Sequence, residues 1–547
     1  MGGRVTLANV TTDTAQLPFV ATHREALEEA KAALAARSYF SRYPESPSPR
    51  IYGETAAADG KAAFEAHLNS LYSALSSQPS DGVVESSEVS PYGPKLGTSY
   101  PKLDLDAAMA AAVAAMPAWR DAGPLGRAAV CLEMVDRINK RSFEIANAVM
   151  HTSGQPFVMS FQAGGPHGQD RALEAIAAAL TEQQRVPETV VWEKPAKPEP
   201  IRMQKDYQIV PRGVAMVIGC NTFPTWNGYP GMFASLACGN AVVVKPHPRA
   251  ILPLAISVEI CREVLTEAGF DPALVQLAAD VDGGTLAKDI ALRPEIAIVD
   301  YTGGPGFGHW LEKEIGGEQG KLVYTEKAGV NSIIIDSTDN LRGMTGNLAF
   351  SFSLYSGQMC TTPQNVYIPS GGIDTPDGHL SFDEVAGAIA KAVERFNGDD
   401  AKAVEILGAT VNDDVRSRAN DLPGLAKSLG GEVVLDNRKV THPAYPDAVV
   451  RTPGLIKVDV TNEPAYTREC FGPTTFLIAT DSTDQSIARL RDTIREHGAM
   501  TAAIYSTSED VLATAREACA AAGVAVAKLP VTANTADRAT VASFRFM

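Results

Sequence analysis

The stretch VAMVIGCNTFPTWNGYPGMFASLACGNAVVVKPHPR, residues 214–249, contains two short β-branched runs separated by a helical segment. Both runs are continuously apolar, which is typical of strands that are buried on both faces of a parallel sheet. Similar runs alternate with helical segments as far as residue 336, and this alternation predicts a doubly wound α/β nucleotide-binding domain. The expected strands cover residues 214–219, 241–244, 274–278, 296–301 and 332–336, and the expected helices cover 232–237, 252–268, 284–292 and 307–315.

Candidate ligand residues follow two of these expected strands, where a doubly wound sheet binds its ligand. Lys245 comes directly after the run 241–244, so its ammonium could bond a ribose or a phosphate, although a lone lysine is more often solvated. Gly303 and Gly304 follow the run 296–301 and open a helix, where backbone amides can hold a phosphate. The turn departs from GxGxxG, and by itself it is a weak signal.

The length of 547 residues allows several domains, and 45% hydrophobic against 20% charged residues predicts a globular chain. We expect an N-terminal helical and loop extension at 1–100 and a cofactor-binding domain at 101–325 that carries a hairpin at 190–210. A catalytic domain at 326–508 and a C-terminal return segment at 509–547 complete the expected organisation.

The charge balance argues against some classes of partner. Lysine and arginine number 48 against 64 acidic residues, and no basic tract interrupts the sequence, so a nucleic-acid partner is not expected. The longest strongly apolar stretch, residues 107–116, is about half the roughly 20 residues that a membrane span needs. The N-terminus has no continuous apolar core of a secretory signal, and we therefore expect no membrane segment and residence in the cytoplasm.

The seven cysteines are scattered singly, and no His/Cys ligand spacing occurs, so no metal site is predicted. Cys360 lies in SGQMCTT, whose small and polar residues differ from the apolar neighbours of an inert core thiol. Core packing is still the commoner role of an arbitrary cysteine. Glu326 lies 34 residues earlier and, taken alone, would be interpreted as a surface residue or as a partner of Lys327.

The order of several short motifs resembles the aldehyde dehydrogenase superfamily, over roughly residues 104–481. That order is more specific than any one of the motifs. They are PRGV at 211–214, the Asn/Phe/Pro loop at 221–224, GNAVVVKP at 239–246, the TG turn at 302–303, the glutamate at 326, GQMC at 357–360 and ECFGP at 469–473.

This resemblance implies an aldehyde-dehydrogenase-like fold and a role for each matched residue. Cys360 is expected to be the nucleophile and Glu326 the base that activates water, so that an aldehyde is oxidised through a cysteine thioester. The remaining matched residues are expected to bind the dinucleotide, with Glu469 on the nicotinamide ribose and Lys245 on the adenosine ribose. These cofactor-binding residues are Lys245, Gly303, Gly304, Glu469 and Phe471.

Two departures from the family pattern matter. The oxyanion asparagine of the family directly precedes Phe-Pro, but here Thr222 holds that position and Asn221 lies one residue earlier. We expect Asn221 to reach the oxyanion, with Thr222 as the alternative. Many NAD-preferring members also carry a glutamate three residues beyond the lysine, whereas this chain has His247 and Arg249 nearby. Loss of that carboxylate favours NADP, with NAD tolerated.

The N-terminal segments at 43–61 and 90–93 resemble the PaaN proteins of phenylacetic acid degradation. That branch implies a ring-opened, coenzyme A-linked semialdehyde as the substrate. A coenzyme A-acylating dehydrogenase and a catalytically silent dinucleotide-binding scaffold are the alternatives, and retention of Glu326 argues against the first of them. The hairpin at 190–210 could support a homodimer.

Overall fold

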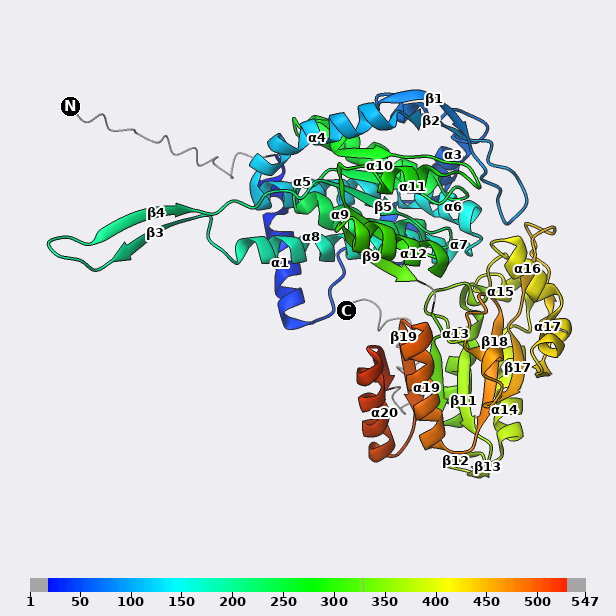
Figure 1. The fold of residues 1–547 in the computed structure, drawn as a ribbon. Helices are drawn as coiled ribbons and strands as arrows, with labels where there is room; N and C mark the ends of the chain where they lie inside the picture. Colours follow the sequence, from blue (N-terminus) through cyan, green and yellow to red (C-terminus); the bar gives the residue numbers. More distant parts are fainter. Residues whose placement is uncertain (1–17, 328, 529–547) are drawn as a thin grey trace, which may run out of the picture.

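The computed structural model describes residues 18–327 and 329–528. Figure 1 shows two α/β lobes, one built around a five-stranded sheet and the other around a seven-stranded sheet, with a long two-stranded hairpin that projects from the first lobe. None of the helices among these residues is both long and apolar enough to span a bilayer.

The first sheet is entirely parallel and has the strand order β7-β6-β5-β8-β9. Four of its strands confirm the predicted runs, and every residue of β5 and β6 is buried. The strands are β5 (Val214–Ile218), β6 (Val242–Lys245), β7 (Val275–Leu277), β8 (Ile296–Gly303) and β9 (Leu322–Lys327), and the helical segments between and after them are α9 (Pro224–Ala237), α10 (Leu252–Glu267), η4 (Pro272–Leu274), α11 (Leu286–Ala291), α12 (Pro305–Trp310) and η5 (Leu311–Glu318).

The placement of the fifth predicted strand in this sheet is wrong. Residues 332–336 do form a strand, β10 (Ser332–Ile335), but it pairs with β11 and β19 of the second sheet. The fifth strand of the first sheet is β9, which the sequence analysis missed. Its residues LVYTEK are only partly buried because β9 is an edge strand, so it has no continuous apolar run.

The second sheet has the order β14-β17-β18-β11-β10-β19-β20 and is parallel except for β14. Alternate residues of β10 face opposite sides, so that Ile333 and Ile335 pack with α13 and α14 and Ile334 packs with α19 and α20. The main elements of this lobe are α13 (Leu341–Ser353), η6 (Leu354–Gly357), β11 (Asn365–Pro369), α14 (Phe382–Phe396), α16 (Asp413–Asn420), α17 (Leu422–Ser428), β14 (Glu432–Leu435), β17 (Gly454–Asp459), β18 (Thr474–Thr480), α19 (Thr483–His497), β19 (Thr501–Tyr505), α20 (Glu509–Ala522) and β20 (Ala525–Lys528).

Shorter elements complete the second lobe, and the segment expected to return at 509–547 contributes α20 and the edge strand β20. Residues 529–547 of that expectation lie outside the described residues. The shorter elements are β12 (Ile373–Thr375), β13 (Gly378–Leu380), α15 (Asp400–Ala403), β15 (Lys439–Val440), β16 (Val450–Arg451) and α18 (Glu463–Tyr466).

Helices from the N-terminal third of the chain surround the first sheet (Figure 1). The buried Trp119 ties this layer to the sheet region, because its indole N–H donates to the carbonyl of Leu236 at 2.8 Å. The elements are α1 (Val20–Ala36), α2 (Pro49–Tyr52), α3 (Ala56–Ala66), η2 (Ser73–Leu75), β1 (Ser80–Glu85), β2 (Ser99–Leu103), α4 (Leu105–Asp121), α5 (Gly123–Lys140), α6 (Ser142–Ser153), α7 (Phe157–Gln162), η3 (Ala163–His167) and α8 (Gly168–Gln184).

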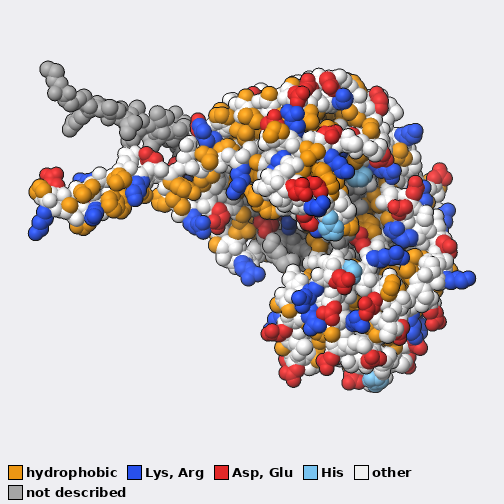
Figure 2. All heavy atoms as spheres, viewed as in Figure 1, with side chains coloured by type: hydrophobic (Ala, Val, Ile, Leu, Met, Phe, Trp, Pro, Cys, Tyr) orange, Lys and Arg blue, Asp and Glu red, His pale blue; other side chains and the backbone are white. Residues whose placement is uncertain are grey.

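The predicted hairpin at 190–210 is confirmed as β3 (Thr189–Lys194) and β4 (Ile201–Asp206), which pair antiparallel. It carries large apolar side chains with no cover from the rest of the described chain: Val191 is 67% exposed and Ile201 is 53% exposed. Figure 2 shows hydrophobic side chains along this projection. An uncovered apolar surface of this kind marks an interaction site more often than a free surface.

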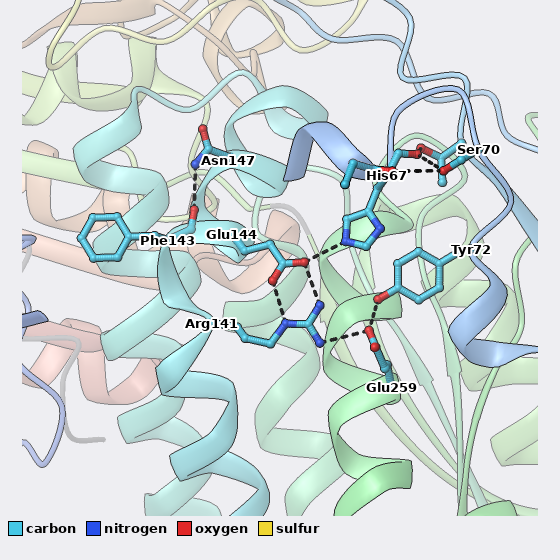
Figure 3. A network of polar contacts seen from close by, with 10 residues as sticks. His67, Ser70, Tyr72, Arg141, Phe143, Glu144, Asn147 and Glu259 are labelled. Atoms are coloured by element: carbon cyan, nitrogen blue, oxygen red, sulfur yellow. Dashed lines mark hydrogen bonds and ion pairs between the residues drawn. The ribbon is translucent and has the colours of Figure 1, made fainter. Parts of the chain in front are cut away.

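The N-terminal extension is joined to α6 and α10 by a polar network (Figure 3). His67, which follows α3, lies 2.8 Å from the carboxylate of Glu144, and Arg141 donates to the same carboxylate at 2.6 Å. Arg141 also pairs with Glu259 at 3.1 Å, and the hydroxyl of Tyr72 donates to Glu259. Burial alone would raise the pKa of Glu144, but the hydrogen bonds and charges of Arg141 and His67 bring it below its usual value.

We expect Glu144→Gln to lower the free energy of unfolding by about 3 kcal/mol, because it removes one of the two carboxylates that pair with the partly buried guanidinium of Arg141. The folded-state pKa of Glu144 lies below the ordinary value of 4.5, so its stabilisation is present above that pH and is lost as the pH falls through the lowered pKa. The difference in thermal unfolding midpoint between wild type and variant should therefore shrink in acid. Glu65→Gln is the matched control, because Glu65 forms an exposed pair with Lys61. An equal decrease in the free energy of unfolding in both variants would contradict this account.

Candidate active site

Cys360 lies in the loop between η6 and β11, directly after a turn of unusual backbone conformation. Tyr355, Ser356 and Gly357 all have positive φ angles, of 53°, 51° and 66°. Only glycine adopts this region without cost, so two consecutive non-glycine residues there store strain that the surroundings must hold. At Gly357 a Cβ atom would lie 2.4 Å from the carbonyl oxygen of Gly472, which excludes any larger residue.

Several hydrogen bonds from the segment around residues 406–411 hold this turn. The amide of Tyr355 donates to Ile406 at 2.9 Å, and the hydroxyl of Ser356 donates to Gly408 at 3.0 Å. Gln358 donates to Ala409 at 3.0 Å. Because all three residues are fully buried, these bonds fix the path of the chain into Cys360.

Asn331 fixes the same loop from the other side, and the sequence analysis missed this residue. Its amide nitrogen donates to the carbonyl of Cys360 at 2.7 Å and to that of Thr362 at 3.2 Å. Its side-chain oxygen accepts from the amides of Met500 and Thr501 at 3.0 Å each. Asn331 is 3% exposed, and a buried carboxamide at the start of an apolar strand is the signal that could have identified it.

Glu326 lies near the end of β9 in the first lobe, close enough to the Cys360 thiol of the second lobe for the charge of its carboxylate to raise the pKa of that thiol. Asn227, on α9, donates to one carboxylate oxygen, Oε2, at 3.1 Å. The other oxygen, Oε1, is buried and has no hydrogen-bond partner within residues 18–327 and 329–528. Glu326 therefore has one oxygen held in place and one oxygen free to accept a proton, and the sequence analysis did not identify Asn227.

The surroundings keep Cys360 protonated at rest. Burial raises the pKa of the Cys360 thiol well above its usual value, and the nearby charges of Glu326 and Cys220 raise it further. Burial likewise raises the pKa of Cys220 to about 11. Of the two routes to a thiolate, a lowered resting pKa or transfer of the proton to a base, the structure favours the second.

Apolar side chains from both lobes gather beside Cys360. Phe223 and Tyr355 pack edge to face with ring centroids 5.8 Å apart, and Met359, the neighbour of Cys360, joins their cluster. Met159 and Trp226 pack against the same cluster. An apolar wall next to a thiol and a carboxylate suits the carbon chain of an uncharged reacting group.

Asn221 is not directed at Cys360 by any hydrogen bond of the described residues. Its amide donates to the carbonyl of Thr152 at 2.9 Å, which holds the loop between β5 and α9. The hydroxyl of Thr222 lies 3.8 Å from the sulfur of Cys220, and the carbonyl of Thr222 accepts from Gln155 at 2.6 Å. Both residues lie in the loop next to the nucleophile, and the choice between them as oxyanion donor stays a prediction.

The predicted cofactor residues of the first lobe lie at the carboxyl edge of its sheet. Lys245 ends β6, is 3% exposed and pairs with Asp280 at 3.5 Å. Gly303 ends β8, and Gly304 precedes α12. A Cβ atom on Gly304 would meet nothing within 4 Å, so the turn leaves its backbone accessible. These positions fit a dinucleotide bound across the sheet edge.

The ECFGP segment approaches from the second lobe, and two side chains hold its backbone. Arg418 on α16 donates to the carbonyl of Phe471 at 2.7 Å, and Gln364 accepts from the amide of Cys470 at 2.5 Å. Glu469 stays accessible to solvent, yet the surrounding chain shields it enough to raise its pKa to about 7, while the charge of Arg418 opposes this shift. A carboxylate that titrates near neutrality is typical of a ligand-binding position.

A metal centre has no candidate among residues 18–327 and 329–528, since no group of three or more His, Cys, Asp or Glu side chains gathers there. The sequence pattern of the aldehyde dehydrogenase family, in contrast, matches residues 97–538. The chain belongs to the aldehyde dehydrogenase family. The match includes the strand ends and loops described above, and it explains why a thiol and a carboxylate from different lobes meet.

Individual aldehyde dehydrogenases are also similar to this chain in sequence or in structure. A structure of an NAD-dependent aldehyde dehydrogenase from Burkholderia multivorans is 52% identical, covers 93% of this chain and 90% of its own, and superposes with a TM-score of 0.89. The N-succinylglutamate 5-semialdehyde dehydrogenase of Chromobacterium violaceum is 27% identical over 404 residues, 73% of this chain and 76% of that protein. The fluoroacetaldehyde dehydrogenase of Streptantibioticus cattleyicolor is 26% identical over 417 residues, 72% of this chain and 74% of that protein.

Proposed function

We propose that this protein oxidises an aldehyde to a carboxylic acid with NAD, through a thioester on Cys360. The observation that carries this proposal is the approach of the Glu326 carboxylate to the Cys360 thiol, with one carboxylate oxygen left unpaired. The 52% identity to a protein described as NAD-dependent supports NAD as the electron acceptor.

The chemistry begins with transfer of the Cys360 proton to Glu326. The sulfur then bonds to the aldehyde carbon, and the carbonyl oxygen becomes an oxyanion that needs hydrogen-bond donors. A bound nicotinamide supplies the hydride acceptor. Loss of hydride leaves a thioester, and Glu326 releases its first proton to solvent. The carboxylate then takes a proton from water as the water oxygen bonds to the thioester carbon, and the carbon–sulfur bond breaks to release the acid while Glu326 returns this proton to the sulfur.

Lys245, Gly303 and Gly304 from the first lobe and Glu469 and Phe471 from the second are the residues that we propose to hold the dinucleotide. They lie on segments that face the carboxyl edge of the first sheet or the nucleophile loop, and two of the loops are fixed by buried polar side chains. Asn221 or Thr222 is the proposed source of the side-chain oxyanion donor.

For the substrate we propose the ring-opened, coenzyme A-linked semialdehyde that the N-terminal segment suggested. The segment that carries this resemblance packs against α7 and η3, which also supply Met159 and Ala163 to the apolar cluster: Tyr52 meets Phe161 edge to face at 5.3 Å, and Glu45 lies 2.8 Å from His167. Arg171 lies over the ring of Trp226 at 5.4 Å, and its Nε has no partner among the described residues. A cation beside the apolar cluster favours an aldehyde that carries an anionic group.

The test is reduction of NAD by the purified protein over a panel of aliphatic, aromatic and coenzyme A-linked semialdehydes, with identification of the product. We expect acid as the product whether or not free coenzyme A is added. Formation of acyl-coenzyme A without acid would show the acylating reaction instead. Binding of NAD with no turnover of any aldehyde would show the silent scaffold.

We also propose that the β3–β4 hairpin supports a homodimer, because its exposed apolar residues need a cover. Replacement of Val191 and Ile201 together by serine should convert the assembly to monomers, as measured by light scattering. Retention of the wild-type mass in that variant would exclude the hairpin as the contact, and the exposed pair Arg202 and Glu193 offers a control for the change in surface.

A further inference from the structure

A buried ion pair joins the carboxyl ends of two neighbouring strands in the first lobe. Lys245 ends β6, and Asp280 follows β7 by three residues. The amide of Ala278 donates to the carbonyl of Val244 at 2.8 Å, so the two strand ends lie side by side. The Lys245 ammonium is 3.5 Å from Oδ2 of Asp280, and the side chains are 4% and 12% exposed.

The loop after Asp280 holds this carboxylate in one orientation. Oδ1 accepts from the amide of Val281 at 2.9 Å, and Gly283 turns the chain with a φ of 76°. A Cβ atom on Gly284 would come within 2.1 Å of Oδ1, so the loop can close around the carboxylate only because residue 284 is glycine. Asp280 is therefore a fixed negative charge at the sheet edge, where a doubly wound fold binds its nucleotide.

The cations that favoured NADP in the sequence analysis are not available in the structure. Burial, together with the charge of Lys245, lowers the pKa of His247 to about 4, so this side chain is neutral near pH 7. Its Nδ1 accepts the backbone amide of Arg249 at 3.1 Å. The guanidinium of Arg249 is paired with Asp282 at 2.7 Å. The structure thus shows one of the two expected cations as neutral and the other in an ion pair, which weakens the basis for a preference for NADP.

We propose that Asp280 selects NAD over NADP by accepting hydrogen bonds from the adenosine ribose hydroxyls and repelling a 2′-phosphate; this rests on the dinucleotide site of the proposed function. A carboxylate is the side chain that NAD-binding folds use for the ribose diol, whereas NADP needs a free cation. Lys245 does not supply one, because Asp280 already balances its charge. Asp280 thereby replaces the glutamate that many NAD-preferring members carry three residues beyond the lysine and that this chain lacks.

The test is fluorescence titration of the full-length protein with NADH and NADPH in the absence of aldehyde. We expect the wild-type protein to bind NADH at least about 100-fold more tightly than NADPH, since a 2′-phosphate would lie close to a fixed carboxylate in a partly buried site. Asp280→Asn and Asp280→Ser should narrow this ratio to less than about tenfold, mainly through tighter binding of NADPH.

Asp289→Asn is the matched control, because Asp289 carries the same charge in the same lobe but is exposed on α11, where its carboxylate accepts from the hydroxyl of Thr285 at 2.9 Å. It should leave the ratio unchanged. Equal binding of both cofactors by the wild-type protein, or an unchanged ratio in both folded Asp280 variants, would overturn the proposal. Loss of Asp280 leaves Lys245 buried without its partner, so a variant could fail to fold. The comparison of NADH and NADPH binding by the wild-type protein tests the proposal even in that case.

The result is separable from the proposed function, because the titration needs no turnover. A protein that binds NADH selectively through Asp280 but oxidises no aldehyde would support the cofactor inference and contradict the proposed reaction. A protein that oxidises aldehydes equally well with both cofactors would support the proposed reaction and contradict the cofactor inference.

Discussion

Replacement of Cys360 by alanine is expected to lower the rate of aldehyde oxidation by about 10⁴-fold or more, because it removes the sulfur that is proposed to form the thioester. Binding of NADH should be unaffected, since Cys360 is held by the nucleophile turn and Asn331 and not by the sheet edge that carries Lys245. The measurements are steady-state cofactor reduction and NADH titration on the same preparation. Thermal unfolding checks that the turn has kept its structure.

Cys220→Ala is the informative control for that experiment. Cys220 is a second thiol in the same site, half-buried, with its sulfur 3.7 Å from the side-chain oxygen of Asn227. We expect this variant to keep most of the activity. If Cys220→Ala is inactive and Cys360→Ala is not, the nucleophile has been assigned to the wrong sulfur.

Glu326→Gln is expected to reduce steady-state turnover by about 10²–10⁴-fold, which is the usual contribution of a general base. Two steps need the carboxylate, namely ionisation of a thiol whose pKa is raised well above normal and deprotonation of the water that attacks the thioester. Rapid mixing with NAD and aldehyde measures how much NADH forms before the slow phase.

Added hydroxylamine separates the two roles, because it cleaves a thioester without a base to activate it. A rapid phase of NADH that hydroxylamine converts into continuous turnover would place the defect in hydrolysis. Absence of the rapid phase would place it in ionisation of Cys360. Glu312→Gln is the matched control, since Glu312 pairs with Lys327 one residue beyond Glu326 at 2.6 Å, and wild-type rates in Glu326→Gln would refute both roles.

The strands of the first sheet could be predicted because buried parallel strands carry their signal locally. The run at 242–244 is apolar throughout and the run from Ile296 is apolar as far as Val299, and both form strands of the first sheet as predicted. The edge strand β9 was missed for the opposite reason, since half-exposed residues such as Tyr324 dilute the apolar pattern. A run of sequence also does not say which sheet it joins, and β10 was placed in the wrong one.

The site was predictable where a motif fixes the residue and unpredictable where a distant partner decides its state. Cys360 and Glu326 were identified from motifs and lie together. The amide of Asn221 is occupied by Thr152, 69 residues away, and Arg249 is paired with Asp282, 33 residues away. Neither contact has a local signature in the sequence, so the prediction that Arg249 favours NADP could not take its partner Asp282 into account.

Asn331 has a consequence for the synthesis of the protein. Its amide nitrogen donates to the carbonyls of Cys360 and Thr362, and its oxygen accepts from the backbone amides of Met500 and Thr501. The loop of Cys360 therefore has all of these hydrogen bonds only after residue 501 has joined the sheet. A nascent chain that has already emerged from the ribosome as far as residue 400 has both its thiol and its carboxylate, but it lacks the strand that seats the thiol. The loop that carries Cys360 is thus completed only once β19 has been synthesised and has paired with β10.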